Sequence, residues 1–516
     1  MMDASETHFN GLVQTIIPIK TSLTPLEAYT VLRSHNSEGY HYLLESVEKE
    51  RRHARFSFVG VSTLGGIRVK GREIKIDLFA ETSLVDRIRS NLEGVCEDLV
   101  LMDHTMRGRI REGCDTFDAL RAAIVIGRPL GGLDLERQVF TGGAIGFVAY
   151  DSVYDSHLDL TPFESDIADA QFALVTETLV FDHLRERTCL VKTEAIEEDT
   201  DREEMQERMS VRGAEIERLL SSRTSDETEE TRGETSDEWG CEIASCTADK
   251  REFEEMVRRA KEHIIDGDIF QVVLSRRYGI KTRKSSYELY QQLRRVNPSP
   301  YMYLFEFEDL SIIGASPETL LTVKDRKVIT NPIAGTCPRG RTPEEDEALA
   351  MEMLSSEKER AEHVMLVDLG RNDVRAVSKP GSVVVEDYMS VLKYSHVQHI
   401  ESRVTGELRE ECDAFDATRA IFPAGTLSGA PKIRAMEIIH EMEKNSRGVY
   451  GGGVGYYSFN GDADFAIVIR TMVKKGDMVY VQAGAGIVAD SDPEYEYNET
   501  EQKMAAMIEG VFGGIR

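Results

Sequence analysis

Short strand-like runs joined by tight turns recur along the whole chain, and they restrict its fold more than any other feature. The runs in the first half are FSFVGVSTLGGIRV, GREIKIDLF, GGAIGFVAYD and FALVTETLVFDH. Those in the second half are YMYLFEFEDLSIIGAS, GGVGYYSF, DFAIVIRTMV and MVYVQAGAGIV. Turns such as FNGDAD and KKGDM are typical of hairpins, which favour antiparallel sheets. With helical segments expected at residues 25–34, 249–266, 286–295, 343–369 and 496–511, the pattern predicts an α+β fold.

An acidic stretch at residues 221–239, rich in Ser and Thr, divides the chain. It is nearly free of apolar residues, so it cannot bury enough surface to fold alone. We therefore expect an N-terminal region over residues 15–200, a linker over 201–244 and a C-terminal region over 245–516. The charged stretch that leads into the linker, from about 194 to 220, is expected to be helical.

The composition argues against several classes of protein. A formal net charge of −29 disfavours nucleic acid or an anionic membrane as a partner. No run of about 18 apolar residues occurs, so no membrane span is expected. The N-terminus lacks a basic patch followed by an apolar segment, which argues against a signal peptide. Seven cysteines without a CxxC pair fit a reduced, cytoplasmic setting better than a disulfide scaffold or a zinc site.

A small-residue loop precedes a helix-like run in FPAGTLSGAPKIRAMEII, residues 422–439. Gly425 and Gly429 lie in the loop, Pro431 closes it, and Lys432 follows at once. Free backbone N–H groups at such a helix start can bind an anion. The same pattern is equally typical of an ordinary turn and helix cap.

Two pairs of glutamates share one spacing. Glu359 and Glu362 are three residues apart, as are Glu496 and Glu499. On a helix, each pair presents both carboxylates on one face. Two such faces brought together would suit Mg²⁺, but in so acidic a chain the spacing alone favours solvated helix faces.

Several groups suited to anion binding lie in the same half of the chain. Gly484 and Gly486 in QAGAGIV allow backbone N–H groups to approach a carboxylate. Arg470 can bind a carboxylate through two parallel hydrogen bonds. Lys503 stands four residues after Glu499, a spacing that also predicts a simple surface ion pair.

The identity of the residues in these segments is more informative than their spacing alone. The loop at 422–439, together with GASPE (314–318), PIAGT (332–336) and VDLGRND (367–373), resembles the chorismate-utilising enzymes, and within them the large subunits of anthranilate synthase. The resemblance covers nearly the whole chain. It implies a four-layer α/β/β/α core with orthogonally packed antiparallel sheets and an active site in a cleft.

The resemblance also implies roles for individual residues. Glu362 and Glu499 are expected to bind Mg²⁺ directly, with Glu359 and Glu496 supporting them. His399, rather than His396, is expected to assist loss of the enolpyruvyl group, and a near-neutral pKa suits that proton transfer. Thr426 and Gln271 join His399 as catalytic candidates. The expected chorismate contacts are Thr426, Gly429, Tyr456, Arg470, Gly484, Ala485, Gly486 and Lys503.

Two positions separate the members of this family by chemistry. Relatives that make isochorismate or salicylate carry a Lys where this chain has Gln271, and a neutral amide cannot activate water in the same way. Aminodeoxychorismate synthases carry a nucleophilic Lys where this chain has Ala334. Both positions favour anthranilate synthase, which forms anthranilate and pyruvate from chorismate and ammonia in the first committed step of tryptophan biosynthesis. The alternatives are an aminodeoxychorismate synthase and a catalytically silent tryptophan-binding subunit.

The resemblance further implies a partner and an inhibitor. No cysteine lies in a glycine-flanked nucleophile elbow, so ammonia is expected from a separate glutamine amidotransferase subunit, in a heterotetramer of two large and two small chains. LLES and NPSPYM resemble two halves of a tryptophan feedback site. The residues expected there are Glu45, Ser46, Pro298, Ser299, Tyr301 and Met302. A strand end packed on a proline-rich turn is the simpler interpretation.

Three departures from the family pattern are visible. Cys337 replaces an Arg after PIAGT, and Arg375 and Ala376 replace Gly and Arg after LGRND. The first two departures are expected to affect substrate or loop geometry. The glycine-bearing turn after Ser46 is replaced by VEKERRHARF, which bears on the strength of feedback inhibition.

Overall fold

The computed structural model describes most of the 516 residues. The described ranges are 11–36, 40–46, 55–80, 82–131, 139–196, 202–222, 241–394 and 397–513. Most of the acidic stretch, the altered turn after Ser46 and His396 lie outside them. Residues 202–221, which the sequence assigns to the linker, form helix α5 (Arg202–Ser221).

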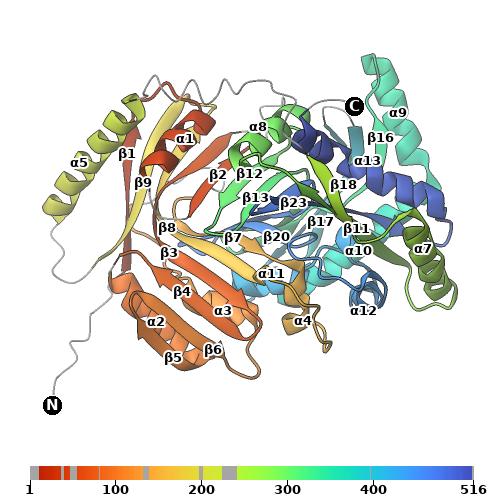
Figure 1. The fold of residues 1–516 in the computed structure, drawn as a ribbon, viewed down its shortest axis with the longest axis horizontal. Helices are drawn as coiled ribbons and strands as arrows, with labels where there is room; N and C mark the ends of the chain where they lie inside the picture. The colour runs from red at the N-terminus through yellow and green to blue at the C-terminus, as the bar shows by residue number, and fades with distance from the viewer. Residues whose placement is uncertain are drawn as a thin grey trace.

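Two antiparallel sheets form the framework of the molecule (Figure 1). The strands of the first sheet, in spatial order, are β10 (Glu242–Cys246), β11 (Gln271–Lys281), β23 (Met478–Ile487), β22 (Thr471–Lys475), β13 (Ser311–Ser316), β12 (Tyr301–Glu306), β2 (His41–Glu45), β3 (Phe56–Lys70), β8 (Ala170–Asp182), β9 (Arg187–Ile196) and β1 (Gly11–Ile19).

The second sheet shares β3 and β8 with the first. Its order is β5 (Cys96–Met102), β6 (Thr105–Ile110), β4 (Glu73–Leu78), β3, β8, β7 (Gly143–Val148), β20 (Gly453–Ser458), β21 (Ala463–Ile467), β14 (Thr319–Lys324), β15 (Lys327–Thr330) and β18 (Val397–Glu407), with β16 (Ile333–Pro338) and β17 (Val384–Lys393) also on β18. Register shifts between Gly60 and Gly65 mark where β3 passes from one sheet to the other. Such bulges bend a strand and increase its twist.

Apolar side chains fill three layers around these sheets. An aromatic cluster that includes Phe58, Phe147, Phe305 and Tyr456 is buried between the two sheets. Helices α1 (Pro25–His35), α8 (Ser286–Val296) and α13 (Pro493–Phe512) cover the outer face of the first sheet. Helices α2 (Ser83–Val95), α3 (Thr116–Ala123), α10 (Glu357–Val377) and α11 (Ala414–Ile421) cover the second. The predicted α+β class and the four-layer α/β/β/α arrangement are confirmed.

Two further helices lie over one end of the first sheet. Helices α7 (Lys250–Ile265) and α12 (Lys432–Glu443) pack on β11 and β23 through a separate apolar cluster. Helix α9 (Pro343–Ser355) contacts β16. Among the described residues, no helix is long and apolar enough to cross a membrane.

The two halves of the chain are related by an approximate internal duplication. The segment TPLEAYTVLRSHN of the first half corresponds to SSYELYQQLRRVN of the second, and YHYLLE corresponds to YMYLFE. Contacts between the halves are reciprocal. Tyr290 and Arg294 donate to Glu45, whereas Tyr29 and Arg33 donate to Glu306.

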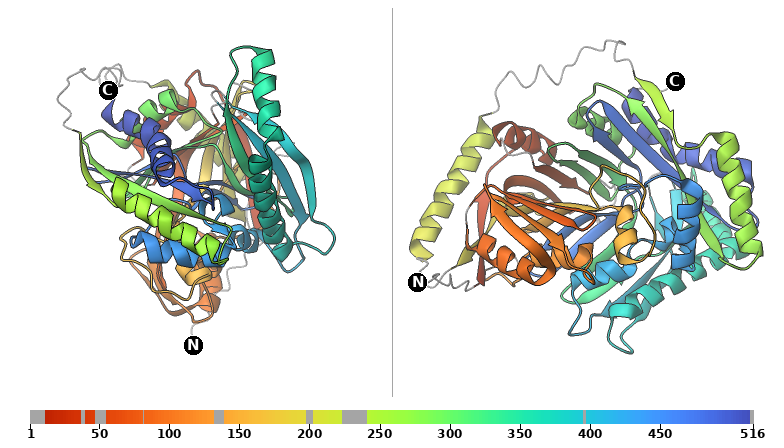
Figure 2. Two further views of the ribbon diagram at one scale, coloured as in Figure 1. Left: turned by 90° about the vertical axis from the view of Figure 1, so that its right-hand side faces the viewer. Right: turned by 60° about the horizontal axis from the view of Figure 1, so that its bottom comes forward.

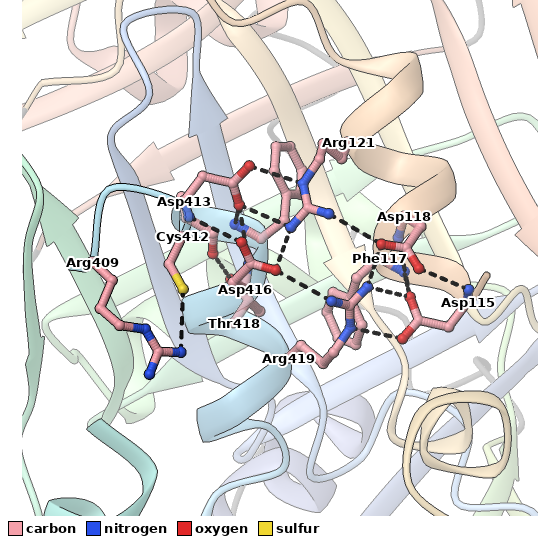
Figure 3. Close-up of polar contacts among 12 residues, drawn as sticks. Asp115, Phe117, Asp118, Arg121, Arg409, Cys412, Asp413, Asp416, Thr418 and Arg419 are labelled. Atoms are coloured by element: carbon pink, nitrogen blue, oxygen red, sulfur yellow. Dashed lines mark hydrogen bonds and ion pairs between the residues drawn. The ribbon is translucent and has the colours of Figure 1, made fainter. Parts of the chain in front are cut away.

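The same relationship recurs where α3 and α11 meet. REGCDTFDALRAA and REECDAFDATRAI are nearly identical, and each helix begins with an aspartate capping box. Arg121 binds Asp413 at 2.8 and 3.1 Å, and Arg419 binds Asp115 at 2.7 Å through two nitrogens (Figure 3). Each arginine therefore neutralises the capping carboxylate of the other helix. This interlock joins the N-terminal half to the C-terminal half on the outer side of the second sheet.

Two expected elements are interrupted. The helix expected over 343–369 divides at Ser356, whose side chain caps α10 by accepting from the backbone N–H of Glu359. The strand expected in DFAIVIRTMV divides into β21 and β22. Arg470 lies in the gap with a φ of 51°, a left-handed conformation uncommon outside glycine.

Candidate active site

The loop at residues 422–431 joins the first sheet beside Gln271. Its two-residue strand β19 (Gly429–Ala430) pairs with the start of β11, where Gly429 lies opposite Val272. Gly429 has a φ of 138°, and a Cβ there would lie 2.2 Å from the carbonyl oxygen of Gln271. Only glycine fits this approach. The loop therefore contacts the backbone of a catalytic candidate rather than forming an isolated turn.

Gln271 is buried between the loop, β23 and α10. Its Nε2 donates to Oε1 of Glu362 at 3.5 Å, and its Oε1 has no partner among the described residues. A Cβ on Gly486 would lie 2.5 Å from the same Nε2. Ala485 between the two glycines is buried, with its side chain in the α7–α12 core. Because Gly486 has no side chain, the amide of Gln271 can occupy this space.

The two glutamate pairs lie on α10 and α13 and influence one another. Burial raises the pKa of Glu362, and the charges of Glu359 and Glu499 raise it further. Burial also raises the pKa of Glu496 to about 7, with an added contribution from Glu499. No group of three or more His, Cys, Asp or Glu side chains in the described ranges is already arranged around a metal ion. The donor set nevertheless suits a divalent cation, because crowded carboxylates repel one another unless a positive charge lies between them.

Lys503 lies on the same side of α13 as Glu499. Its Nζ is 3.2 Å from Oε1 of Glu499 and donates to the carbonyl oxygen of Gly484 at 2.9 Å. The ammonium group therefore connects the glutamate pair with the glycine-rich end of β23. The i, i+4 ion pair considered as the simpler interpretation is present, and Lys503 contacts the site as well.

Arg470 stands at the centre of the remaining candidates. Tyr450, Glu499, Glu318 and His399 all lie close enough to interact with it electrostatically, and its burial lowers its pKa. The break between β21 and β22 allows this position, because a continuous strand would have kept Arg470 in the sheet ladder. An anionic ligand beside Arg470 would thus meet four ionisable groups.

Glu318 is a functional candidate that sequence reasoning missed. Thr426, which lies in the short helix η2 (Gly425–Leu427), donates a hydrogen bond of 2.9 Å to Oε1 of Glu318. Burial raises the pKa of Glu318 to about 7, although Lys503 and Arg470 oppose the shift. A carboxyl group with this pKa retains its proton near neutral pH and can donate it. The signal was present in GASPE, which we used only to support the resemblance.

The tyrosine next to Arg470 is Tyr450 rather than Tyr456. A Cβ on Gly484 would lie 2.9 Å from the hydroxyl of Tyr450. Tyr456 instead belongs to the aromatic cluster between the sheets, with its ring centre 4.9 Å from that of Phe140. The structure does not bring Tyr456 together with the other expected substrate contacts.

His399 lies on β18 and is held by the PIAGT segment. Its Nδ1 is 2.8 Å from the carbonyl oxygen of Gly335, so Nδ1 carries the hydrogen and Nε2 of the neutral ring is free to accept a proton. Burial lowers the pKa of His399, and Arg470 lowers it further. The imidazole is therefore neutral and suited to act as a base.

The two segments of the expected tryptophan site meet in the first sheet. Met302 of β12 pairs directly with Glu45 of β2, and Ser46 follows at the end of that strand. The carboxylate of Glu45 is occupied by Tyr290 at 2.7 Å and Arg294 at 3.1 Å.

The second segment supplies the other expected contacts. Pro298 and the buried Ser299 lie in the turn before β12. The hydroxyl of Tyr301 contacts Thr319 at 3.0 Å and Asp464 at 3.1 Å.

Comparison with known proteins agrees with this geometry. The family described as chorismate binding enzyme matches residues 127–509. Anthranilate synthase component 1 2 of Haloarcula marismortui is 47% identical over 96% of this chain and 92% of its own length. Anthranilate synthase component 1 of Haloferax volcanii is 46% identical over 96% and 93%. The chain belongs to the anthranilate synthase component 1 family of chorismate-binding enzymes.

Solved structures extend the comparison. The crystal structure of anthranilate synthase component I from Streptococcus pneumoniae matches with a TM-score of 0.64 at 37% identity, covering 90% of this chain and 94% of that one. The menaquinone-specific isochorismate synthase of Escherichia coli shares the fold at 16% identity, with a TM-score of 0.64 over 97% and 94%. The same fold thus occurs at low sequence identity.

The departures from the family pattern lie at different distances from the site. Cys337 lies in β16 opposite Gln398, the residue before His399, and burial raises the pKa of its thiol. Arg375 and Ala376 are exposed near the end of α10. Of these, only Cys337 borders a catalytic candidate.

Proposed function

We propose that this chain is the large subunit of an anthranilate synthase, which converts chorismate and ammonia to anthranilate, pyruvate and water. The observation that carries the proposal is the neutral Gln271 amide, 3.5 Å from Glu362 in a site where water-activating relatives have a lysine. Ala334 likewise offers no nucleophile, which argues against aminodeoxychorismate synthase. The identity of the relatives, over nearly the full chain, supports the same conclusion.

Different side chains assist different steps of the reaction. Ammonia forms a C–N bond at C2 of chorismate, the C4 hydroxyl leaves as water, and the C3 enolpyruvyl group leaves as pyruvate once the C2 proton is removed. Glu318, protonated near neutral pH, donates to the leaving hydroxyl. His399 accepts the C2 proton through Nε2. Arg470 and Lys503 bind carboxylate oxygens of the substrate.

We also propose that Glu362 and Glu499 bind Mg²⁺, with Glu359 and Glu496 supporting them. When bound, the ion supplies positive charge that offsets the four carboxylates and binds a substrate carboxylate. Thermal unfolding tests this without turnover. Mg²⁺ should raise the melting temperature of the wild-type chain, because it relieves carboxylate repulsion in the folded state only. The Glu362→Gln/Glu499→Gln variant should show no such rise, and an equal rise in both proteins would exclude this site.

The ammonia source and the inhibitor complete the proposal. A separate amidotransferase subunit supplies ammonia in a complex of two large and two small chains. Tryptophan inhibits the enzyme through a site at Glu45 and Met302, where β2 ends and β12 begins. Support comes from the direct pairing of these two residues across β2 and β12.

The isolated chain with chorismate, Mg²⁺ and ammonium tests the activity. Anthranilate fluorescence should increase with time and decrease when tryptophan is added. Release of aminodeoxychorismate instead would identify the sister enzyme. Tryptophan binding without any product would identify a silent regulatory subunit and refute the proposal.

A further inference from the structure

Arg447 is a buried charged residue that none of the proposed steps of the reaction uses. It follows helix α12, which lies beside α7 at one end of the first sheet (Figure 2). The side chain of Arg447 is 1% exposed, and that of its partner Glu443, the last residue of α12, is 6% exposed. Because the cost of removing two charges from water offsets most of their attraction, a buried ion pair is weak evidence for stability alone. The pair is therefore a candidate for a role beyond the fold.

The guanidinium group of Arg447 donates hydrogen bonds to three separate elements. Its Nε and Nη2 donate to the two carboxylate oxygens of Glu443. Its Nη1 donates to the carbonyl oxygen of Leu427 at 2.7 Å, and its Nη2 donates to that of Val273 at 2.6 Å. Because the guanidinium is planar and rigid, these bonds fix the positions of helix α12, the loop at 422–431 and strand β11 relative to one another.

The carboxylate of Glu443 makes further contacts with β11. It accepts from the backbone N–H of Ser275 at 2.7 Å and from the hydroxyl of Ser275 at 3.0 Å. Ser275 lies in the same strand as Gln271, which begins it. The charge of Arg447 is therefore compensated within the protein by a carboxylate that is itself held in place. This arrangement suits a residue that holds the backbone better than one that binds a substrate carboxylate.

The carbonyl group that Arg447 holds is next to the residue that contacts the proposed proton donor. Leu427 and Thr426 both belong to the single turn η2. Thr426 donates to Oε1 of Glu318 at 2.9 Å. A displacement of the Leu427 carbonyl therefore moves Thr426 as well. Misplacing a reacting group by about 1 Å can lower a rate about 100-fold.

We propose that Arg447 is a positioning residue for the proton-donating step. It fixes the Leu427 carbonyl against β11, so that the hydroxyl of Thr426 keeps Glu318 in one orientation. This inference rests on the proposed function, in which Glu318 is the proton donor. The alternative is that Arg447 only stabilises the fold. The two interpretations differ in whether loss of Arg447 acts through Thr426.

Turnover of chorismate with ammonium, in the absence of tryptophan, tests the proposal in the full-length chain. Arg447→Lys keeps a positive charge beside Glu443 but lacks the planar fork, so it should lower kcat about 100-fold. Arg55→Lys is the matched control, because Arg55 binds the carboxylate of Asp182 at 3.0 and 3.2 Å and its side chain is only 8% exposed. Since Arg55 lies in the N-terminal half, the control should lower the melting temperature by a similar amount and leave kcat within about twofold.

A double-mutant cycle with Thr426→Val identifies the path of the effect. Thr426→Val already lacks the hydroxyl that contacts Glu318, so adding Arg447→Lys should lower kcat by less than about threefold more. Burial raises the pKa of Glu318 and the hydrogen bond from Thr426 opposes this rise, while Lys503 and Arg470 also face the carboxyl group. Loss of the Thr426 bond should therefore move the fall of kcat/KM to higher pH in Arg447→Lys and in Thr426→Val alike.

The remaining outcomes decide the role of Arg447. An equal loss of kcat in the wild-type and Thr426→Val backgrounds, or an unchanged pH dependence in Arg447→Lys, would overturn the inference. If Arg447→Lys does not fold, Arg447→Gln/Glu443→Gln removes both buried charges and should show the same dependence on Thr426. A wild-type chain that converts chorismate to another product would refute the proposed function, while the cycle, measured as chorismate consumption, would still decide the role of Arg447.

Discussion

Glu45 and Glu306 occupy corresponding positions in the two halves of the duplicated chain. Comparing them can separate a structural role of this glutamate from a regulatory one. Both carboxylates accept a tyrosine hydroxyl and an arginine from the opposite half of the chain. Only Glu45 lies in the proposed tryptophan site. Replacing each in turn with Gln removes the same charge from similar surroundings, apart from a further hydrogen bond that Ser286 donates to Glu306, so each variant serves as the control for the other.

The expected loss of stability follows from the exposure of the partners. The side chains of Glu45 and Glu306 are 3% and 9% exposed, whereas those of Arg294 and Arg33 are 37% and 48% exposed. A hydrogen bond to a buried charged group contributes about 1.5–3 kcal/mol, but a solvated arginine reduces the ion-pair share to about 0–1 kcal/mol. Gln still accepts from tyrosine, so each variant should lose about 1–2 kcal/mol. Urea denaturation monitored by fluorescence measures this loss.

Tryptophan inhibition should distinguish the Glu45→Gln variant from the Glu306→Gln variant. If the Glu45 carboxylate accepts the ammonium group of tryptophan, Glu45→Gln should lose about 1.5–3 kcal/mol of inhibitor binding, which raises the half-inhibitory concentration about 10- to 150-fold. Glu306→Gln should leave that concentration within about twofold. Equal shifts in both variants, or no shift in Glu45→Gln, would refute a direct role of Glu45 and leave it as part of the interlock.

Three further predictions concern the active site. Gln271→Lys should abolish anthranilate formation while chorismate is still consumed to hydroxylated product, which chromatography detects; unchanged anthranilate would contradict the role of the neutral amide. Because the raised pKa of Glu318 keeps it protonated below about pH 7, kcat/KM should fall as pH rises through this value. Glu318→Gln should lose about 10²–10⁴-fold in rate together with that limb, and a retained limb would point to another group. Tyr450→Phe should raise the KM for chorismate about tenfold, whereas Tyr456→Phe should leave it unchanged, and the reverse result would restore Tyr456 as the substrate contact.

Much of the framework is predictable because it depends on local patterns. The strand runs, the hairpin turns and helices such as α1 and α8 follow from alternation, capping residues and periodicity. The break at Ser356 was also predictable, because Ser356 is followed three residues later by Glu359, a typical helix start. The sequence nevertheless predicts one continuous helix, because both flanking segments are helix-like and no Gly or Pro lies between them.

Other features depend on contacts between distant segments. Tyr450 and Tyr456 flank one glycine run, and only the pairing of β20 with β7 turns Tyr456 into the aromatic core. The left-handed Arg470 sits in a run that reads as one strand, so its position beside Glu318 required the structure. The duplication also escaped notice, because the matching segments are short and their spacing changes along the chain.

The contacts that the duplication repeats belong to the structural framework, whereas the active site lies in one half only. The reciprocal contacts at Glu45 and Glu306, and again at Asp115 and Asp413, fix the two halves symmetrically. Every catalytic candidate, by contrast, lies in the C-terminal half, between Gln271 and Lys503. A ligand bound at the end of β2 and the start of β12 would therefore touch both halves at once. Through the hydroxyl of Tyr301 it reaches Thr319, the neighbour of the proton donor in the proposed reaction. Because that path involves one hydrogen bond and one peptide unit, we expect a displacement of β12 by a bound ligand to reach Glu318.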